Sequence, residues 1–158
     1  MKQPALLAAA CLLLPGIARA QVDISQVWVN PGFYSLHFDR NKGLDDANPG
    51  IGFEWPIDKT FSLTAGTFRN SDRDQSDYAG RYVMPFEFYG VKFGAVVGGF
   101  NGYQMTRNGG WFAALIPVAA IEGRRFGLNI AIIPNIKDRL YGAISFQLKF
   151  RFSDGSDP

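Results

Sequence analysis

The stretch "YGAISFQLKFRF", residues 141–152, alternates between bulky apolar residues and small or polar residues over most of its length. Successive side chains of a β-strand point to opposite faces, so this pattern predicts a strand with one apolar face and one small or polar face. Lys149 and Arg151 belong to the polar face. The bulky residues that would share the other face are Ile144, Phe146, Leu148, Phe150 and Phe152.

Seven other segments of the chain show the same alternation or a less regular, β-like composition. Residues 21–158 show no helical period, so the chain is predicted to be all-β, with eight strands. The seven segments are residues 34–38, 51–55, 61–68, 78–86, 91–100, 111–121 and 126–133.

The connections between these segments alternate in length along the chain. In an antiparallel up-and-down barrel this alternation brings all the long loops to one end, and short turns opposite longer loops are typical of transmembrane β-barrels. The aromatic content of 15% and the 18 glycines fit such a barrel, which needs interfacial rings and closely spaced strands. The short connections are residues 56–59, 89–90 and 122–125, and the long ones are residues 39–48, 69–77, 101–110 and 135–139.

The N-terminal residues have the layout of a secretory signal peptide. Lys2 precedes an apolar run at residues 5–14, and a small-x-small cleavage site ends at Ala20. The apolar run is too short to span a membrane as a helix. We therefore expect residues 1–20 to be a signal peptide and residues 21–158 to form a single outer-membrane β-barrel domain.

The charge and cysteine content of residues 21–158 narrows the function further. Two of the 16 Lys and Arg residues lie in the predicted signal peptide, which leaves 14 to balance the 14 Asp and Glu residues. This balance gives no support to a nucleic-acid partner. Cys11 also lies in the signal peptide, so the exported domain has no disulfide and must be stabilised in another way.

An eight-stranded barrel can also be soluble, as in lipocalins, with its apolar faces inward. In this chain the polar faces carry mostly Gly, Ser, Ala and Thr, which suit a narrow interior, whereas the apolar faces carry Phe, Leu, Ile and Trp. We therefore predict a transmembrane barrel of the bacterial outer membrane. Eight strands enclose only side chains or one small ligand, which leaves an enzyme, a binding or adhesion barrel, or a structural barrel rather than a pore.

The chain has one histidine, His37, near the end of the first predicted strand and on its inward face. Ser71, with Ser76 as a second choice, follows the third predicted strand and would reach the same rim. Acyl transfer needs a base beside a hydroxyl and a group that orients the base, for which Asp39, Asp72 and Asp74 are candidates. Strict alternation points residue 70 inward and residue 71 outward, so the loop must bend there for the serine to meet the imidazole.

The acids of the predicted rim loops have a second interpretation. They could bind water or divalent cations between lipopolysaccharide head groups. This interpretation applies to Asp45, Asp46, Asp74 and Asp77.

Three stretches of the chain resemble the outer-membrane lipid A palmitoyltransferase (PagP) family. They are "YSLHFDRNKGLDDANPGIGFEW" at residues 34–55, "FRNSDRDQSDYAG" at 68–80 and "LIPVAAIEGRRFGLNIAIIPN" at 115–135. The resemblance implies a barrel that moves a palmitoyl chain from a glycerophospholipid donor to a lipid A (lipopolysaccharide) acceptor in the outer leaflet. It implies no metal or diffusible cofactor. We expect a monomer.

The resemblance also implies roles for individual residues. His37 would be the base and Ser71 the polarised hydroxyl or nucleophile, with Asn70 and Asp72 as orienting groups. Substrate would be bound at Asp39, Gly80, Tyr82 and Arg107. Pro117 and Pro134 would mark a lateral gap for lipid entry, because proline cannot donate to a strand ladder; ordinary strand ends or bulges would explain them equally well.

Three features of the chain depart from that family. We expect the family's amphipathic helix before the first strand to be missing, since only residues 21 to about 27 are available for it. Asn70 stands where the family has an ionisable acid, and Tyr82 aligns near the small glycine that sets the acyl-chain length, so a shorter chain or none could be bound.

Two other functions compete with the acyltransferase. A lipid A deacylase on a similar barrel would carry a His-x-Ser signature, which is absent because His37 is followed by Phe38 and Asp39. A structural or adhesion barrel would tolerate replacement of the rim residues.

Overall fold

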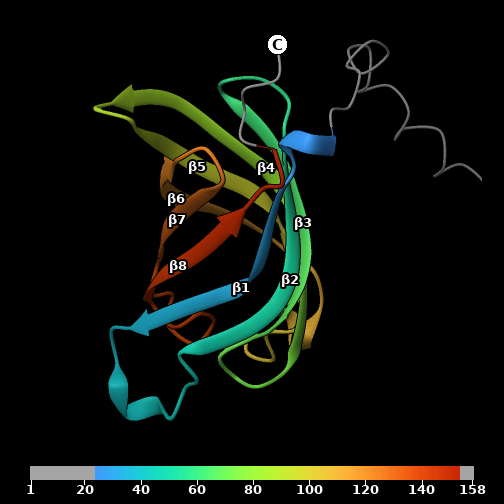
Figure 1. The fold of residues 1–158 in the computed structure, drawn as a ribbon. Helices are drawn as coiled ribbons and strands as arrows, with labels where there is room; N and C mark the ends of the chain where they lie inside the picture. Colours follow the sequence, from blue (N-terminus) through green and yellow to red (C-terminus); the bar gives the residue numbers. More distant parts are fainter. Residues whose placement is uncertain (1–23, 154–158) are drawn as a thin grey trace, which may run out of the picture.

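The computed structural model describes residues 24–153, which form a closed antiparallel barrel in which each strand pairs with the next and β8 pairs with β1 (Figure 1). The prediction of an all-β, eight-stranded up-and-down barrel is therefore confirmed. The predicted signal peptide lies outside the described residues. The strands are β1 (Trp28–His37), β2 (Ala47–Pro56), β3 (Phe61–Arg69), β4 (Gln75–Phe88), β5 (Val91–Phe100), β6 (Phe112–Glu122), β7 (Phe126–Ile133) and β8 (Ala143–Phe150).

The described residues also form three short 3-10 helices: η1 (Ile24–Gln26), η2 (Arg40–Lys42) and η3 (Arg107–Gly109). No helix in the described part of the chain is long and apolar enough to cross a membrane.

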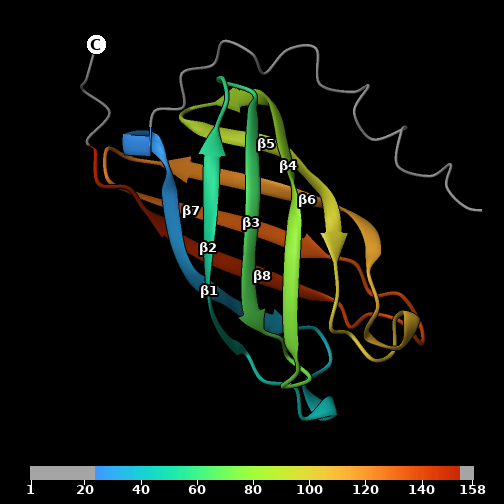
Figure 2. The ribbon, with the colours of Figure 1, turned by 90° about the vertical axis from the view of Figure 1, so that its right-hand side faces the viewer.

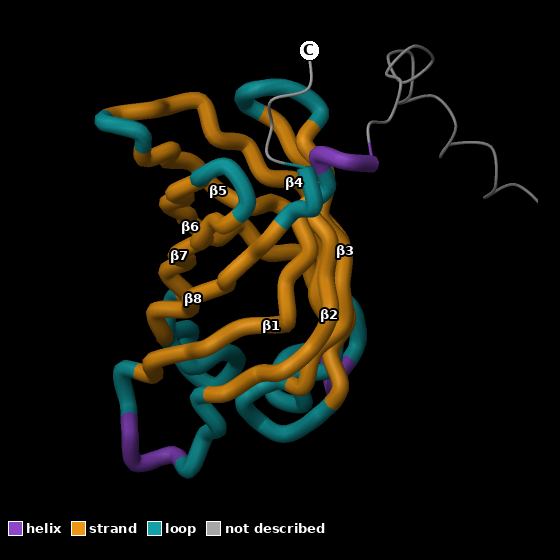
Figure 3. The backbone as a smooth tube through the Cα atoms, in the orientation of Figure 1, coloured by secondary structure: helices purple, strands orange, loops and turns teal. Residues whose placement is uncertain are grey.

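The long connections lie at one end of the barrel and the short turns at the other, as the sequence predicts. Figure 3 shows η2 and η3 in the long loops at the lower end, and η1 beside the short turns at the upper end. We call these the loop end and the turn end. In Figure 2 the strands of the near wall, β2 to β4, cross those of the far wall, β6 to β8, as tilted strands of a closed barrel do.

Several strands differ from their predicted limits. β2 begins at Ala47 and not at residue 51, and β4 begins at Gln75 and not at residue 78. β1 begins at Trp28, well before the predicted residue 34, because Pro31 and Gly32 interrupt the alternation. The register between β1 and β2 shifts between Asn30 and Gly32, so the strand continues through a bulge that hides its period. β8 ends at Phe150, so the terminal aromatic residue of the opening stretch lies just beyond the sheet.

The faces of β8 are those that the opening stretch predicts. Ser145, Gln147 and Lys149 are buried inside the barrel, whereas Leu148 is 65% exposed on the outside. The lipocalin-like arrangement, which turns the apolar face of this strand inward, is therefore wrong for β8. Large apolar side chains are exposed on the outer face of other strands too, among them Ile51, Phe53, Leu63, Val97, Leu115 and Ile132.

A network of charged and amide side chains fills the turn half of the barrel interior. The Nζ atom of Lys149 lies 2.8 Å from Oε2 of Glu54 and 2.6 Å from Oε1 of Glu122. The amide of Asn129 donates to Glu54 and to Oε1 of Gln147, at 3.0 and 3.1 Å. We call these five residues the polar plug. It occupies the turn half of the narrow interior with side chains from β2, β6, β7 and β8.

Removing the central cation of the polar plug should destabilise the barrel strongly. Lys149 is almost fully buried, so Lys149→Met leaves Glu54 as a buried charge without its counter-ion, at a cost of about 3–5 kcal/mol. Urea unfolding monitored by tryptophan fluorescence measures the change, because Trp28 lies 5.0 Å from the Lys149 ammonium.

Two controls accompany this prediction. Lys137→Met makes the same change at an exposed loop position and should leave the unfolding midpoint unchanged. The double variant Glu54→Gln/Lys149→Met removes both charges and should recover most of the loss. Wild-type stability of the single Lys149→Met variant would contradict the role assigned to the plug.

Candidate active site

A cavity of about 110 Å³ occupies the loop half of the barrel interior. Its wall is mostly aromatic and aliphatic. Its floor includes Tyr82, whose hydroxyl donates to Gln147 and accepts from Asn129, each at 3.3 Å. Tyr82 therefore separates the apolar cavity from the polar plug.

A chain of aromatic rings runs along the cavity wall. The ring centroids of Phe33 and Phe68 are 4.9 Å apart, and those of Phe68 and Tyr78 are 5.9 Å apart. The chain continues through Phe100 to Phe112, at 6.0 and 6.2 Å. These rings come from β1, β3, β4, β5 and β6, so they join five strands around one apolar space that suits a hydrocarbon ligand.

The predicted base, His37, is buried at the loop end of β1 and lines the cavity. Its Nδ1 atom lies 3.1 Å from Oδ1 of Asp46, in the loop that follows η2. A carboxylate at this position takes the hydrogen bond of Nδ1–H and leaves Nε2 as the basic nitrogen. Asp46, which the sequence suggests only as a water or cation ligand, is therefore the acid that orients the imidazole.

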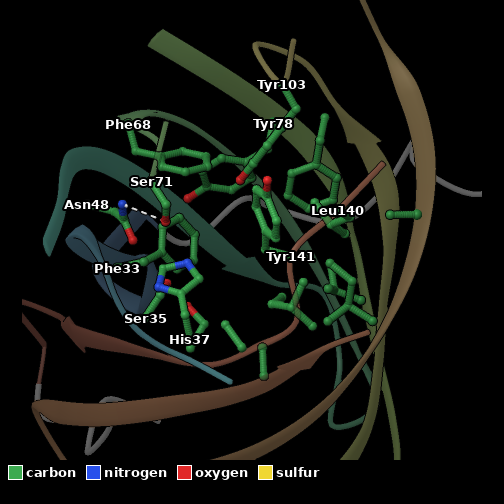
Figure 4. Close-up of a pocket in the computed structure, with 18 of the residues that line it drawn as sticks. Phe33, Ser35, His37, Asn48, Phe68, Ser71, Tyr78, Tyr103, Leu140 and Tyr141 are labelled. Atoms are coloured by element: carbon green, nitrogen blue, oxygen red, sulfur yellow. Dashed lines mark hydrogen bonds between the residues drawn. The ribbon is translucent and has the colours of Figure 1, made fainter. Parts of the chain in front are cut away.

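The predicted hydroxyl, Ser71, lines the same cavity, and its Oγ atom accepts a hydrogen bond from the Asn48 amide at 3.3 Å. Figure 4 shows Ser71, Asn48, Ser35 and His37 on one side of the cavity. The loop bends at Asn70, whose carbonyl accepts from the Arg73 amide at 2.9 Å. This is the bend that the serine needs in order to face inward. No hydrogen bond joins Ser71 to His37 within the described chain.

One backbone hydrogen bond and one bidentate ion pair join the loop beside Asp46 to the loop of Ser71. The Asp45 amide donates to the Ser71 carbonyl at 3.0 Å, and the Arg73 guanidinium donates to both Asp45 carboxylate oxygens, at 3.1 and 3.2 Å. Those donors lower the pKa of the Asp45 carboxyl. The loop that carries Asp46 is thus tied directly to the loop that carries Ser71.

Asn70 is buried, and its contacts are with its own loop and the next one. Its amide nitrogen donates to Ser76 Oγ at 2.9 Å and to the Gly102 carbonyl at 2.8 Å. Its side-chain oxygen accepts from the backbone amides of Asp72 and Asp74, both at 3.0 Å. To orient the base, Asn70 would have to contact His37. The hydrogen bonds of the Asn70 side chain go instead to the two loops, whose conformation they stabilise.

The two acids predicted near the base lie in different places. Asp72 lines the cavity mouth, where partial burial and the charge of Asp74 raise its pKa while His37 lowers it. Asp39 accepts from the Asn41 backbone amide at 3.0 Å and pairs with Lys42 at 3.8 Å, which caps the η2 turn. The acid that contacts the imidazole is thus Asp46 and not Asp39.

The remaining predicted binding residues are spread over the barrel. Gly80 points inward from β4, where an added Cβ would lie 2.7 Å from the Val97 carbonyl, so glycine is needed for the close approach of β5. Arg107 is exposed in η3 and donates to the Trp111 carbonyl at 3.2 Å. Neither residue lines the cavity, whereas Tyr82 forms part of its floor.

The two prolines flank an interruption of the strand ladder. Pro117 lies in β6, and the last pair between β6 and β7 is the next residue, Val118, with Ala131. In the described chain, β6 residues 112–117 pair with β5 alone, and Ile132 and Ile133 pair with β8 alone. Pro134 follows the end of β7 directly.

Several cavity residues are not among the sequence-based candidates. Asn48 points into the barrel, as every second residue of β2 does through Gly50, Gly52 and Glu54. The alternation could therefore have identified it, but Pro49 and the composition of the adjoining loop obscured the start of β2. Ser35 is two residues before His37 on the same inward face, and its Oγ lies 3.2 Å from Ser145 Oγ. The loop residues Tyr103 and Arg139 reach the cavity through a loop geometry that the sequence pattern does not reveal.

Within residues 24–153, no group of three or more His, Cys, Asp or Glu side chains lies close enough to hold a metal ion. No protein-family model matches the chain, and no curated protein matches it.

The contacts of Asn70 predict that Asn70→Asp is harmful, although the resemblance makes aspartate the expected residue. The substitution places a carboxylate oxygen against the Gly102 carbonyl in place of a donor, at a cost of about 1–3 kcal/mol. Hydrogen exchange of the loop amides should become faster for residues 70–76 and 101–103. The matched control is Asn108→Asp at an exposed loop position, which should not change exchange. Unchanged exchange in the Asn70→Asp variant would contradict this role.

Proposed function

We propose that the protein is a lipid A acyltransferase of the bacterial outer membrane, similar to the PagP family, with a glycerophospholipid as acyl donor. The observation that carries this proposal is an apolar cavity whose mouth holds a His37–Asp46 pair and the Ser71 hydroxyl. An acyl chain fits an apolar wall, and an ester at its end would lie beside a base and a hydroxyl.

The outer face of the barrel supports a membrane location. Outward residues on β1, β2, β5, β6, β7 and β8 are uncharged, and many are large and apolar. Strands that present a band of this kind to lipid are typical of outer-membrane barrels. With the short turns on the periplasmic side, the loop end and its site lie at the outer leaflet, where lipid A is found.

The His37–Asp46 pair would act as the general base. The Asp46 carboxylate accepts a hydrogen bond from Nδ1–H, so Nε2 can take a proton from the attacking hydroxyl group. When the acceptor hydroxyl attacks the donor ester, its proton passes to Nε2 and then to the departing oxygen of the donor. The products are an acylated acceptor and a lysophospholipid.

Ser71 would act at the same ester. Its Oγ accepts from the Asn48 amide, so its own proton is free to be donated to the developing oxyanion, or to be removed by His37 if the serine is the nucleophile. Both routes use the same pair of side chains. Both require the loop ties that hold Asp45, Ser71 and Arg73 together.

The depth of the cavity favours an acyl chain shorter than palmitoyl. Phe112 and Val118 both line it, and six residues of a tilted strand span roughly 15 Å along the barrel axis. An extended chain that rises about 1.25 Å per methylene would place about a dozen carbons in that length. Tyr82 closes the floor at this level, where the resembling family has a small residue.

Lipid would enter the cavity from the side. The ladder between β6 and β7 ends at Val118, so the loop halves of these strands are not joined by backbone hydrogen bonds. Pro117 has no N–H to restore such a bond. Separating the two strands at this level would therefore break fewer hydrogen bonds than it would elsewhere in the barrel.

Mass spectrometry of lipid A from bacteria with and without the protein tests the proposed reaction. The proposal predicts a lipid A species heavier by one acyl chain. His37→Ala and Ser71→Ala should each lower its formation by about a hundredfold or more, because each removes a group that acts on the reacting ester. Loss of an acyl chain from lipid A would identify a deacylase instead.

Two matched variants separate catalysis from folding. Asp46→Asn removes the acid that orients the imidazole and should reduce activity strongly, whereas Asp39→Asn makes the same change at an acid that does not contact His37 and should have little effect. An unchanged lipid A profile from a folded barrel would overturn the proposal and favour a structural or adhesion role.

A further inference from the structure

The outward face of the described strands carries three charged residues. Arg69 is the last residue of β3, and Asp77 lies near the start of β4, so both lie at the loop end. Arg81 is different, because it lies midway along β4, paired with Leu63 of β3 and Val97 of β5. It is the one charge of the described strands that lies within the apolar outer face.

The side chain of Arg81 runs toward the turn end of the barrel. Its guanidinium carbon lies 4.0 Å from the ring centroid of Phe61, the first residue of β3 at that end. Phe61 pairs with Val83, two residues nearer the turn end than Arg81, which is roughly 7 Å along the strand. The charge is thus displaced from the middle of the apolar band toward its edge, as long cationic side chains do in membranes.

The stacking on Phe61 leaves the donors of Arg81 available. A ring contacts the flat face of a guanidinium, whereas its N–H groups point outward from the edge. Among residues 24–153, Arg81 makes no ion pair with a carboxylate, and its side chain makes no hydrogen bond. A guanidinium edge of this kind matches the two oxygens of a phosphodiester.

We propose that Arg81, held in place by Phe61, binds the phosphate of an anionic phospholipid in the leaflet at the turn end of the barrel. This inference rests on the proposed membrane location but not on the proposed acyl transfer. The bound lipid is distinct from the acyl donor, because Arg81 lies on the outer face of β4 and the cavity lies inside the barrel at the loop end.

Trp55 provides a reporter for this site. It is the outward residue of β2 that pairs with Leu63, and Leu63 pairs with Arg81, so the three residues form one row across neighbouring strands. Trp55 and Arg81 are therefore about 10 Å apart across the sheet. Of the other two tryptophans, Trp28 is buried inside the barrel, and Trp111→Phe removes the exposed one.

The experiment measures quenching of Trp55 fluorescence in vesicles that contain a brominated phospholipid. The Trp111→Phe protein is reconstituted in phosphatidylcholine with brominated phosphatidylglycerol, or with brominated phosphatidylcholine as the reference. The proposal predicts that phosphatidylglycerol associates more strongly by about two- to fivefold, the range expected for an ion pair at an interface. Arg81→Gln should abolish the preference, and Arg69→Gln, an outward arginine at the opposite end, should leave it unchanged.

The outcomes distinguish this proposal from the one on which it rests. Equal quenching by both lipids, or a preference that persists in Arg81→Gln, would overturn the lipid site while leaving the barrel in the membrane. No quenching by either lipid would show that Trp55 does not contact acyl chains, and would overturn the membrane location together with the lipid site.

Discussion

The ion pairs of Lys149 with Glu54 and Glu122 divide the barrel interior into two parts. An eight-stranded barrel is too narrow for a wide channel, so what fills one half decides what the other half can hold. Buried charges persist only when they are paired and hydrogen-bonded, and Asn129 supplies part of that bonding. The polar plug therefore occupies the turn half, and the apolar cavity lies in the loop half, on the other side of Tyr82.

The candidate chemistry depends on loops that are tied to each other as well as on the strands. His37 is fixed by β1, but its partner Asp46 and the Ser71 hydroxyl both come from loops. The ion pair of Arg73 with Asp45 and the bond from the Asp45 amide to Ser71 join these loops. A rigid sheet thus supplies the base and the apolar wall, and loop–loop contacts place the remaining groups at the cavity mouth.

The sequence predicted the barrel because period-two alternation is a local signal that survives in most strands. It also placed His37 inward and at the same rim as Ser71, since strand direction follows from counting connections. The start of β1 was missed because a bulge at Asn30–Gly32 breaks the period. The partner of His37 was missed because a loop carries Asp46 back to the imidazole, and loop paths have no period to read. The resemblance suggested that Asn70 orients the base and that Asp39 binds substrate. Their side chains instead make hydrogen bonds within the loops, to the Gly102 carbonyl and to the Asn41 amide.

We propose that the cavity holds an acyl chain that enters from the surrounding lipid. A phospholipid with a photoactivatable diazirine near the end of one acyl chain tests it directly, in vesicles that contain the reconstituted protein. After irradiation, mass spectrometry of peptides locates the attachment. An acyl chain inside the barrel should give adducts on inward residues such as Ile116 and Val118 as well as on their outward neighbour Leu115. Adducts confined to outward residues, with none inside the barrel, would contradict it.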